Sequence, residues 1–66
     1  MKLKVTINSN DQQRIKDKIK DISILYDEDF LLPNIAFIDI DIKDYSYLKS
    51  ISGIRVEKES YGYLMD

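Results

Sequence analysis

Apolar and polar residues alternate strictly over residues 2–8, at the start of the chain. The apolar positions are Leu3, Val5 and Ile7, and the polar positions between them are Lys2, Lys4 and Thr6. Because successive side chains of a β-strand point to opposite faces, this period of two predicts a half-buried strand.

The apolar spacing then changes to that of a helix, over about residues 11–21. Ile15, Ile19 and Ile22 are spaced i, i+4 and i+7 and form one stripe. Ahead of them, Ser9 and Gln12 have the spacing of a capping box, in which each side chain satisfies a free backbone amide of the other. We expect the charged face of this helix to be solvated; it comprises Arg14, Lys16, Asp17, Lys18, Lys20 and Asp21.

Two further strands are predicted on either side of a chain reversal. Residues 23–30 alternate weakly and carry three acidic residues at 27–29, which favours either an edge strand or an irregular strand end. Pro33 and Asn34 predict the reversal. Residues 35–42 form the most β-like run of the chain. On one face it carries Ala36, Ile38, Ile40 and Ile42, and on the other Ile35, Phe37, Asp39 and Asp41.

A short helix and a last strand complete the pattern. We expect Asp44 to cap a helix over about residues 45–51, which would bury Tyr47, Leu48 and Ile51. Gly53 follows this helix, where a left-handed residue is favoured. The last strand begins at Ile54, with Ile54 and Val56 pointing inward and Arg55 and Glu57 outward.

The predicted order is strand, helix, strand, strand, helix, strand. It indicates one α+β domain over residues 1–66, a ferredoxin-like β-α-β-β-α-β sandwich with residues 60–66 as a C-terminal tail. Since crossovers of this kind are right-handed, both helices are expected on one face of a four-stranded antiparallel sheet. The other face should be bare and lined by Lys2, Lys4, Thr6, Phe37, Asp39, Asp41, Arg55 and Glu57.

Composition limits the classes of partner. The chain has ten basic and twelve acidic residues and a net charge of -2, which argues against nucleic acid because phosphate binding needs concentrated positive charge. Its longest apolar run, residues 35–38, is far below the roughly 20 residues of a membrane span, so no membrane partner is expected. No signal-peptide core is present at the N-terminus. We therefore expect either a cytoplasmic protein or a processed segment of a secreted precursor.

Catalysis is not expected, because the chain has neither histidine nor cysteine and so lacks the common triads, dyads and zinc sites. Asp39 and Asp41 share a predicted strand face, but cross-strand pairing with Lys2 and Lys4 explains them more simply than acid–base work. Residues 39–44 begin like a calcium loop, yet they lack its glycine and its terminal glutamate. We expect no catalytic residue, no metal and no cofactor.

Protein binding is the class of function that remains. Phe37 and Ile35 give the bare face an apolar centre, and residues 61–65 form an apolar tail, Tyr-Gly-Tyr-Leu-Met, that no later element covers. The alternative is that this tail folds back on its own domain. An RNA-binding domain of the same topology would stack bases on Phe37, but Asp39 and Asp41 would repel phosphates.

The segment FLLPNIAFIDIDIKDYSYLKSISGIRVEKESYGYLMD resembles the second half of subtilisin-type prodomains, the propeptide inhibitors of subtilisin-like serine proteases. The matching pieces are Phe30, Asn34, Ile35 to Ile40, Leu48-Lys49, Gly53 and Val56-Glu57-Lys58-Glu59. The first strand is also similar to that of the family, so the resemblance covers nearly the whole chain. The first helix and the following loop are shorter than in the best-known members.

This resemblance implies a ferredoxin-like inhibitor and intramolecular folding chaperone that is a monomer when free. Its sheet face, with Ile35, Phe37 and Asp39, would lie on two helices of the protease, and Glu57 and Glu59 would cap the N-termini of those helices. The tail would enter the active-site cleft as a product-like strand formed by Tyr61, Gly62, Tyr63, Leu64, Met65 and Asp66. Either Met65 or Leu64 would precede the scissile position, and Asp66 would fit the first pocket poorly. The alternative class is a ferredoxin-like interaction or regulatory module, with a homodimer as one form.

Overall fold

The computed structural model describes residues 1–58 of the chain. Glu59 and the predicted tail therefore lie outside the described residues. The elements are β1 (Lys2–Ile7), α1 (Gln12–Ile22), β2 (Ser23–Glu28), β3 (Ile35–Ile40), the 3-10 turn η1 (Ile42–Asp44), α2 (Tyr45–Ser50) and β4 (Ile54–Lys58). This order confirms the predicted α+β class and the β-α-β-β-α-β arrangement.

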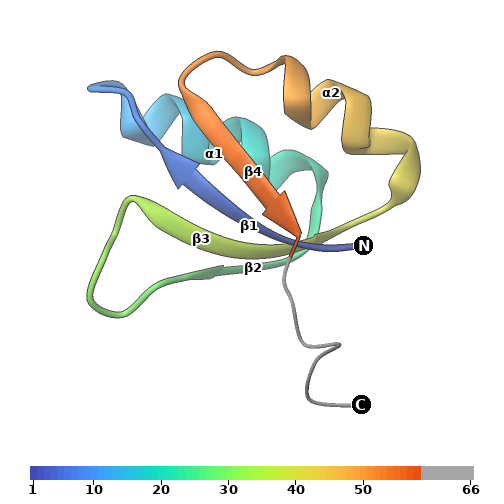
Figure 1. Ribbon diagram of the computed structural model, residues 1–66, viewed down its shortest axis with the longest axis horizontal. Coiled ribbons are helices and arrows are strands. Elements are labelled where there is room, and N and C mark those ends of the chain that lie inside the picture. The colour runs from blue at the N-terminus through green and yellow to red at the C-terminus, as the bar shows by residue number, and fades with distance from the viewer. Residues whose placement is uncertain (59–66) are drawn as a thin grey trace.

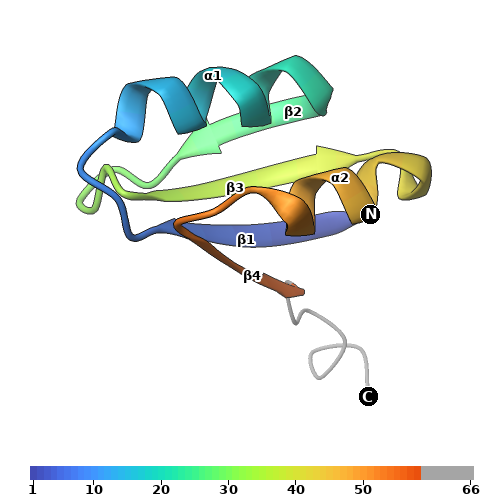
Figure 2. The ribbon, with the colours of Figure 1, turned by 90° about the horizontal axis from the view of Figure 1, so that it is seen from above.

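The four strands form one antiparallel sheet in the order β2-β3-β1-β4. The strand that begins the chain, β1, lies in the centre beside β3, and β2 and β4 form the two edges. The acidic end of β2 predicted the edge position of that strand. Figures 1 and 2 show α1 and α2 on the same side of this sheet. The arrangement is consistent with a ferredoxin-like fold.

The hydrophobic core lies between the two helices and the face of the sheet that they cover. It comprises Leu3, Val5, Ile7, Ile15, Ile19, Ala36, Ile38, Ile40 and Leu48. Ile54 and Val56 pack against this cluster while remaining partly exposed, as expected for an edge strand. The alternation of β1 and β3 and the stripe of α1 therefore predicted most of the core correctly.

The predicted capping box at the start of α1 does not form. The hydroxyl of Ser9 accepts a hydrogen bond from the backbone amide of Asp11 at 3.1 Å, which makes a local turn instead of a cap. Asp11 is the N-cap residue of α1, but its side chain makes no capping hydrogen bond. Ser9 thus lies two residues too early to cap the helix.

β3 is two residues shorter than predicted and is followed by η1, whereas α2 begins at Tyr45 as predicted. Its partner β1 reaches only to Lys2, which is opposite Asp39, so the strand ends before Asp41. The carboxylate of Asp41 accepts a hydrogen bond from the amide of Lys43 at 3.1 Å and starts η1. Ile42 is consequently 72% exposed and not buried. Asp44 is already part of this turn and its side chain caps nothing.

α2 buries a different tyrosine from the one predicted. Leu48 is fully buried, and Ile51 packs against the core. Tyr47, however, is 48% exposed, and Tyr45 takes the predicted place against the core. Tyr45, rather than Tyr47, is therefore the tyrosine of α2 that contacts the core.

Gly53 has the predicted left-handed backbone, with φ at 83°. An added Cβ atom would lie 3.1 Å from the Cβ atom of Ser9 and 3.5 Å from Cδ1 of Ile15. The carbonyl of Gly53 also accepts the amide of Asn8 at 2.7 Å. Glycine is therefore required here for both its conformation and its lack of a side chain.

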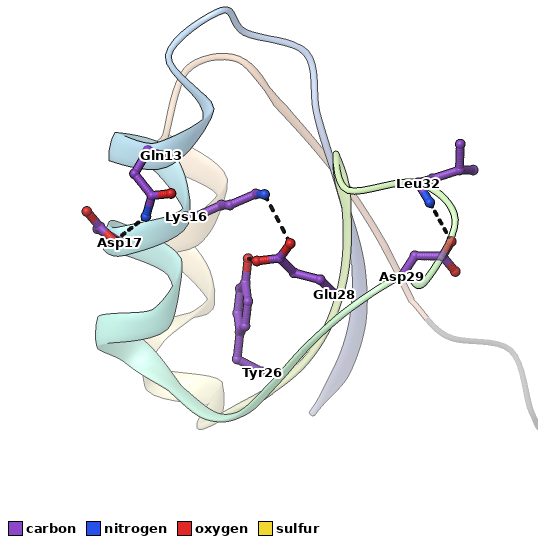
Figure 3. A network of polar contacts seen from close by, with 7 residues as sticks. All are labelled: Gln13, Lys16, Asp17, Tyr26, Glu28, Asp29 and Leu32. Atoms are coloured by element: carbon purple, nitrogen blue, oxygen red, sulfur yellow. Dashed lines mark hydrogen bonds and ion pairs between the residues drawn. The ribbon is translucent and has the colours of Figure 1, made fainter.

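Lys16 does not belong to a solvated charged face. It is only 9% exposed, and its ammonium forms an ion pair with Glu28 of β2 at 3.1 Å (Figure 3). The hydroxyl of Tyr26 lies 3.5 Å from the same carboxylate, and the ammonium of Lys20 lies 5.1 Å from the centre of the Tyr26 ring. Burial of the phenol, followed by the charge of Glu28, raises the pKa of Tyr26 to about 12. This network fastens α1 to the edge strand.

Candidate functional site

The face of the sheet opposite the helices is the candidate functional site, and we call it the open face. Strand alternation and pairing place on it Lys2, Lys4 and Thr6 of β1, Leu25 and Asp27 of β2, Ile35, Phe37 and Asp39 of β3, and Arg55 and Glu57 of β4. No helix among residues 1–58 covers this face, since both helices lie on the other side of the sheet (Figure 1).

Phe37 lies at the centre of the longest row across the open face. Lys4 pairs with Phe37 on one side and with Glu57 on the other, and Asp27 is opposite Phe37 on its far side. The row therefore runs from a carboxylate through an aromatic ring and an ammonium to a second carboxylate. An apolar centre bordered by charges is typical of a protein interface with a polar rim.

The three predicted contact residues of β3 lie on the open face together. Ile35, Phe37 and Asp39 are each half-buried by their neighbours on the sheet. The neighbouring Leu25 is 64% exposed and continues the apolar centre towards the edge. The apolar part of the open face thus follows β3 and reaches β2.

The predicted charge pairing of the two aspartates is only partly correct. Asp39 is opposite Lys2 in the sheet, but its carboxylate forms its ion pair with the ammonium of Met1 at 3.0 Å. Asp41 does not lie on the open face, because it caps η1. An acid–base pair of Asp39 and Asp41 is therefore not assembled.

Glu57 lies on the open face as predicted, on edge strand β4. The nearest cationic atom is Nε of Arg55 at 3.8 Å, which is a long ion pair, and the side chain of Glu57 is 44% exposed. This carboxylate is accessible to a partner that approaches the open face. The other predicted capping carboxylate, Glu59, lies outside the described residues, as do all six residues of the predicted cleft strand, 61–66.

Sequence reasoning missed the contribution of β2 and of the loop after it. Leu25 and Asp27 lie on the open face through their pairing with Asp39 and Phe37. A shift in register between Ser23 and Leu25 weakens the alternation that would have identified them. The loop residues Phe30 and Leu31 are 88% and 82% exposed; the signal for them was a run of three apolar residues directly before the proline.

Within residues 1–58, no three acidic side chains come together in a group that could hold a metal ion. Phe37 is the one aromatic residue on the open face of the described strands, since Tyr26 is opposite the buried Ile38 and faces the helices. The helices of this part of the chain are also too short and polar to cross a membrane.

Comparisons of the chain with protein-family models, with curated proteins and with solved structures give no match. The open face and the resemblance of the sequence are therefore the two features that bear on function.

Proposed function

We propose that this chain is a prodomain-like inhibitor and folding chaperone of a subtilisin-like serine protease. The inhibitor binds by its open face and places residues 61–66 in the active-site cleft as a product-like strand. The observation that supports this most is the open face itself. It combines half-buried Ile35 and Phe37 with an accessible carboxylate, Glu57, on the strand that leads into the tail.

The carboxylate of Glu57 suits a helix N-terminus on the partner. Such an N-terminus offers free backbone amides and about half a positive charge. Arg55 competes weakly for this carboxylate at 3.8 Å, so binding does not break a strong internal pair. Glu59 follows two residues later in the sequence and supplies the second capping carboxylate in this proposal.

The tail adds a strand to the enzyme, so backbone hydrogen bonds give affinity and the side chains give selectivity. In one register Met65 precedes the scissile position, and in the other Leu64 does. Replacing each residue in turn by glutamate distinguishes the two registers. The glutamate substitution at the residue that occupies the first pocket is expected to cause the larger loss of inhibition.

The test is an inhibition assay against a panel of subtilisin-like and chymotrypsin-like proteases. We expect competitive inhibition of a subtilisin-like enzyme by the full chain, and a loss of about 100-fold or more when residues 61–66 are removed, since this corresponds to roughly 2.7 kcal/mol of binding free energy. Undiminished inhibition by the shortened chain contradicts the role of the tail. No inhibition of any protease in the panel contradicts the whole proposal.

The second candidate is a ferredoxin-like interaction or regulatory module that pairs with a second copy of itself. It is favoured by the mixed charges of the open face, where Lys4 lies between Phe37 and Glu57, and by the exposed apolar residues of edge strand β2. This candidate predicts a homodimer, whereas the inhibitor is a monomer when free. Sedimentation equilibrium at micromolar concentration separates the two.

A further inference from the structure

The loop between β2 and β3, residues 29–34, carries the most exposed apolar side chains that are described. Phe30 is 88% exposed, Leu31 is 82% exposed and Leu32 is 51% exposed. Figures 1 and 2 show this loop at the end of the sheet opposite the N-terminus. A single exposed apolar residue is ordinary on a protein surface. Three consecutive exposed apolar side chains form a patch of the kind that marks a binding site.

The loop is held in one shape by its own hydrogen bonds. The carboxylate of Asp29 accepts a hydrogen bond from the backbone amide of Leu31 at 3.1 Å. It also accepts one from the amide of Leu32 at 2.9 Å (Figure 3). The amide of Asp29 donates to the carbonyl of Ile35 at 2.8 Å, and the amide of Ile35 donates to the carbonyl of Leu32 at 2.9 Å. An apolar loop that is already ordered loses little conformational entropy on binding.

The loop is also tied to the open face. The amide of Ile7 in β1 donates to the carbonyl of Asn34 at 2.8 Å, which fixes the end of the loop to the central strand. Ile35, the next residue, begins the apolar part of the open face. A partner seated on Ile35 and Phe37 is therefore next to the loop.

Charge indicates the chemistry of the partner at this place. The stretch from residue 21 to residue 42 contains no lysine or arginine, and Asp27, Glu28 and Asp29 directly precede the apolar loop residues. Glu28 is paired with Lys16 of α1, so the net negative charge beside the loop comes from Asp27 and Asp29. An acidic hairpin is repelled by the anionic surface of a membrane, although its exposed apolar tip resembles a membrane-inserting loop. The complementary surface is an apolar recess with a basic rim on a protein.

We infer that the loop at residues 29–34 is a second anchor of the inhibitor, which inserts Phe30 and Leu31 into an apolar, basic-rimmed recess on the protease. This inference rests on the proposed function and adds a contact site outside the active-site cleft. The loop then contributes affinity without occupying the substrate subsites, so it selects among proteases that have similar clefts.

The test compares inhibition constants against a protease that the full chain inhibits. The test variant is Phe30→Ser with Leu31→Ser, and the matched control is Ile42→Ser with Tyr47→Ser, which removes two exposed apolar side chains from the helical side and its η1 turn. We expect the loop variant to inhibit at least about tenfold more weakly, as loss of an aromatic interface residue commonly costs this much. The control should inhibit like the parent.

A third variant, Asp29→Ala, keeps the apolar side chains but removes the carboxylate that orders the loop. A smaller loss of inhibition, about threefold to tenfold, is expected from the added ordering cost and from the removal of one acidic charge beside the basic rim. Thermal unfolding followed by circular dichroism verifies that each variant is folded.

The outcomes separate the loop from the proposed function. If the full chain inhibits and the loop variant inhibits equally well, the anchor is disproved while the inhibitor proposal stands. If no protease is inhibited, both are disproved. Dimerisation of the parent that the loop variant abolishes would assign the loop to a second copy. Binding of the parent to phosphatidylglycerol vesicles that the variant abolishes would assign it to a membrane. Each of these last two results overturns the inference.

Discussion

The two faces of the sheet arise from the same alternation along the same strands, yet they differ in what covers them. On the covered face, Leu3, Val5 and Ile38 are at most 2% exposed beneath α1 and α2. On the open face, their neighbours Lys4 and Phe37 are only half-buried, by each other and by adjacent strands. We conclude that the covered face provides stability and that the open face is available for binding, so substitutions on the two faces should have separable effects.

The largest effect on stability is expected from Leu48→Ala on the covered side. Leu48 is 0% exposed, and removing a buried leucine side chain costs about 2–5 kcal/mol of unfolding free energy. A domain of 66 residues has only about 5 kcal/mol or little more in total. Urea denaturation should therefore show a variant that is partly unfolded in buffer.

Tyr47→Ala is the matched control, because Tyr47 is the preceding residue and is 48% exposed. It should lower the free energy of unfolding far less than the substitution at Leu48 does. Equal losses for the two variants would contradict the orientation of α2.

A smaller effect is expected from Gly53→Ala, which tests the turn between α2 and β4. The left-handed backbone, with φ at 83°, costs a residue with a side chain about 1–2 kcal/mol. The contact of the new methyl group with Ser9 at 3.1 Å adds to this loss. Ser52→Ala, at the preceding residue, is the control. Equal stability of the two variants would argue against the strain that a side chain is expected to cause at position 53.

The ion pair between Lys16 and Glu28 gives an asymmetric prediction. Glu28→Gln leaves a nearly buried ammonium without its carboxylate, and we expect a loss of about 1 kcal/mol, since Glu28 is itself 37% exposed. Lys16→Met keeps the buried stem and removes the charge, so it should be nearly neutral. Chemical denaturation of both variants tests this order, and a larger loss for Lys16→Met than for Glu28→Gln would contradict the cost assigned to the unpaired ammonium.

The smallest effect concerns alkaline pH. The pKa of Tyr26 is raised from 10.0 to about 12 in the folded protein, so the unfolded chain releases this proton first. The contribution of Tyr26 to the free energy of unfolding is complete below pH 10 and is lost as the pH rises towards 12. Tyr26→Phe should therefore lose less stability than the parent between pH 10 and pH 12, as measured by urea denaturation. Identical pH profiles would contradict the burial of this phenol.

The parts of the fold that the sequence predicts are those governed by local periodicity. The alternation of β1, the stripe Ile15 and Ile19 of α1, and the left-handed Gly53 are all found in the structure. In each case the residue type and its spacing are enough to predict the local conformation, because the tertiary contacts of these residues agree with their local preference.

The errors arise where tertiary contacts decide between local alternatives. Ile42 continues the alternation of β3, but no residue of β1 is left to pair with it, and Asp41 turns the chain into η1. Lys16 has the same charge as its neighbours on α1, and only the approach of Glu28 from β2 makes its burial favourable. Sequence periodicity shows neither where the pairing of β3 with β1 ends nor that Glu28 approaches Lys16.

The candidate site was predicted in part for the same reason. Ile35, Phe37, Asp39 and Glu57 follow from strict alternation, and all four lie on the open face. Leu25 was missed because the register shift in β2 interrupts the alternation. Phe30 was assigned to the end of a strand, because an apolar residue after a strand pattern is not distinguishable from a continuation of it without knowing that Asp29 turns the loop.

The most direct test of the central claim is competitive inhibition of a subtilisin-like protease by the parent chain and by Phe37→Ser, each with its unfolding free energy measured in parallel. We predict that the variant remains folded and inhibits at least about tenfold more weakly, which is a loss of roughly 1.4 kcal/mol or more in binding. Equal inhibition by the two proteins, with equal stability, would contradict the assignment of the open face as the binding surface.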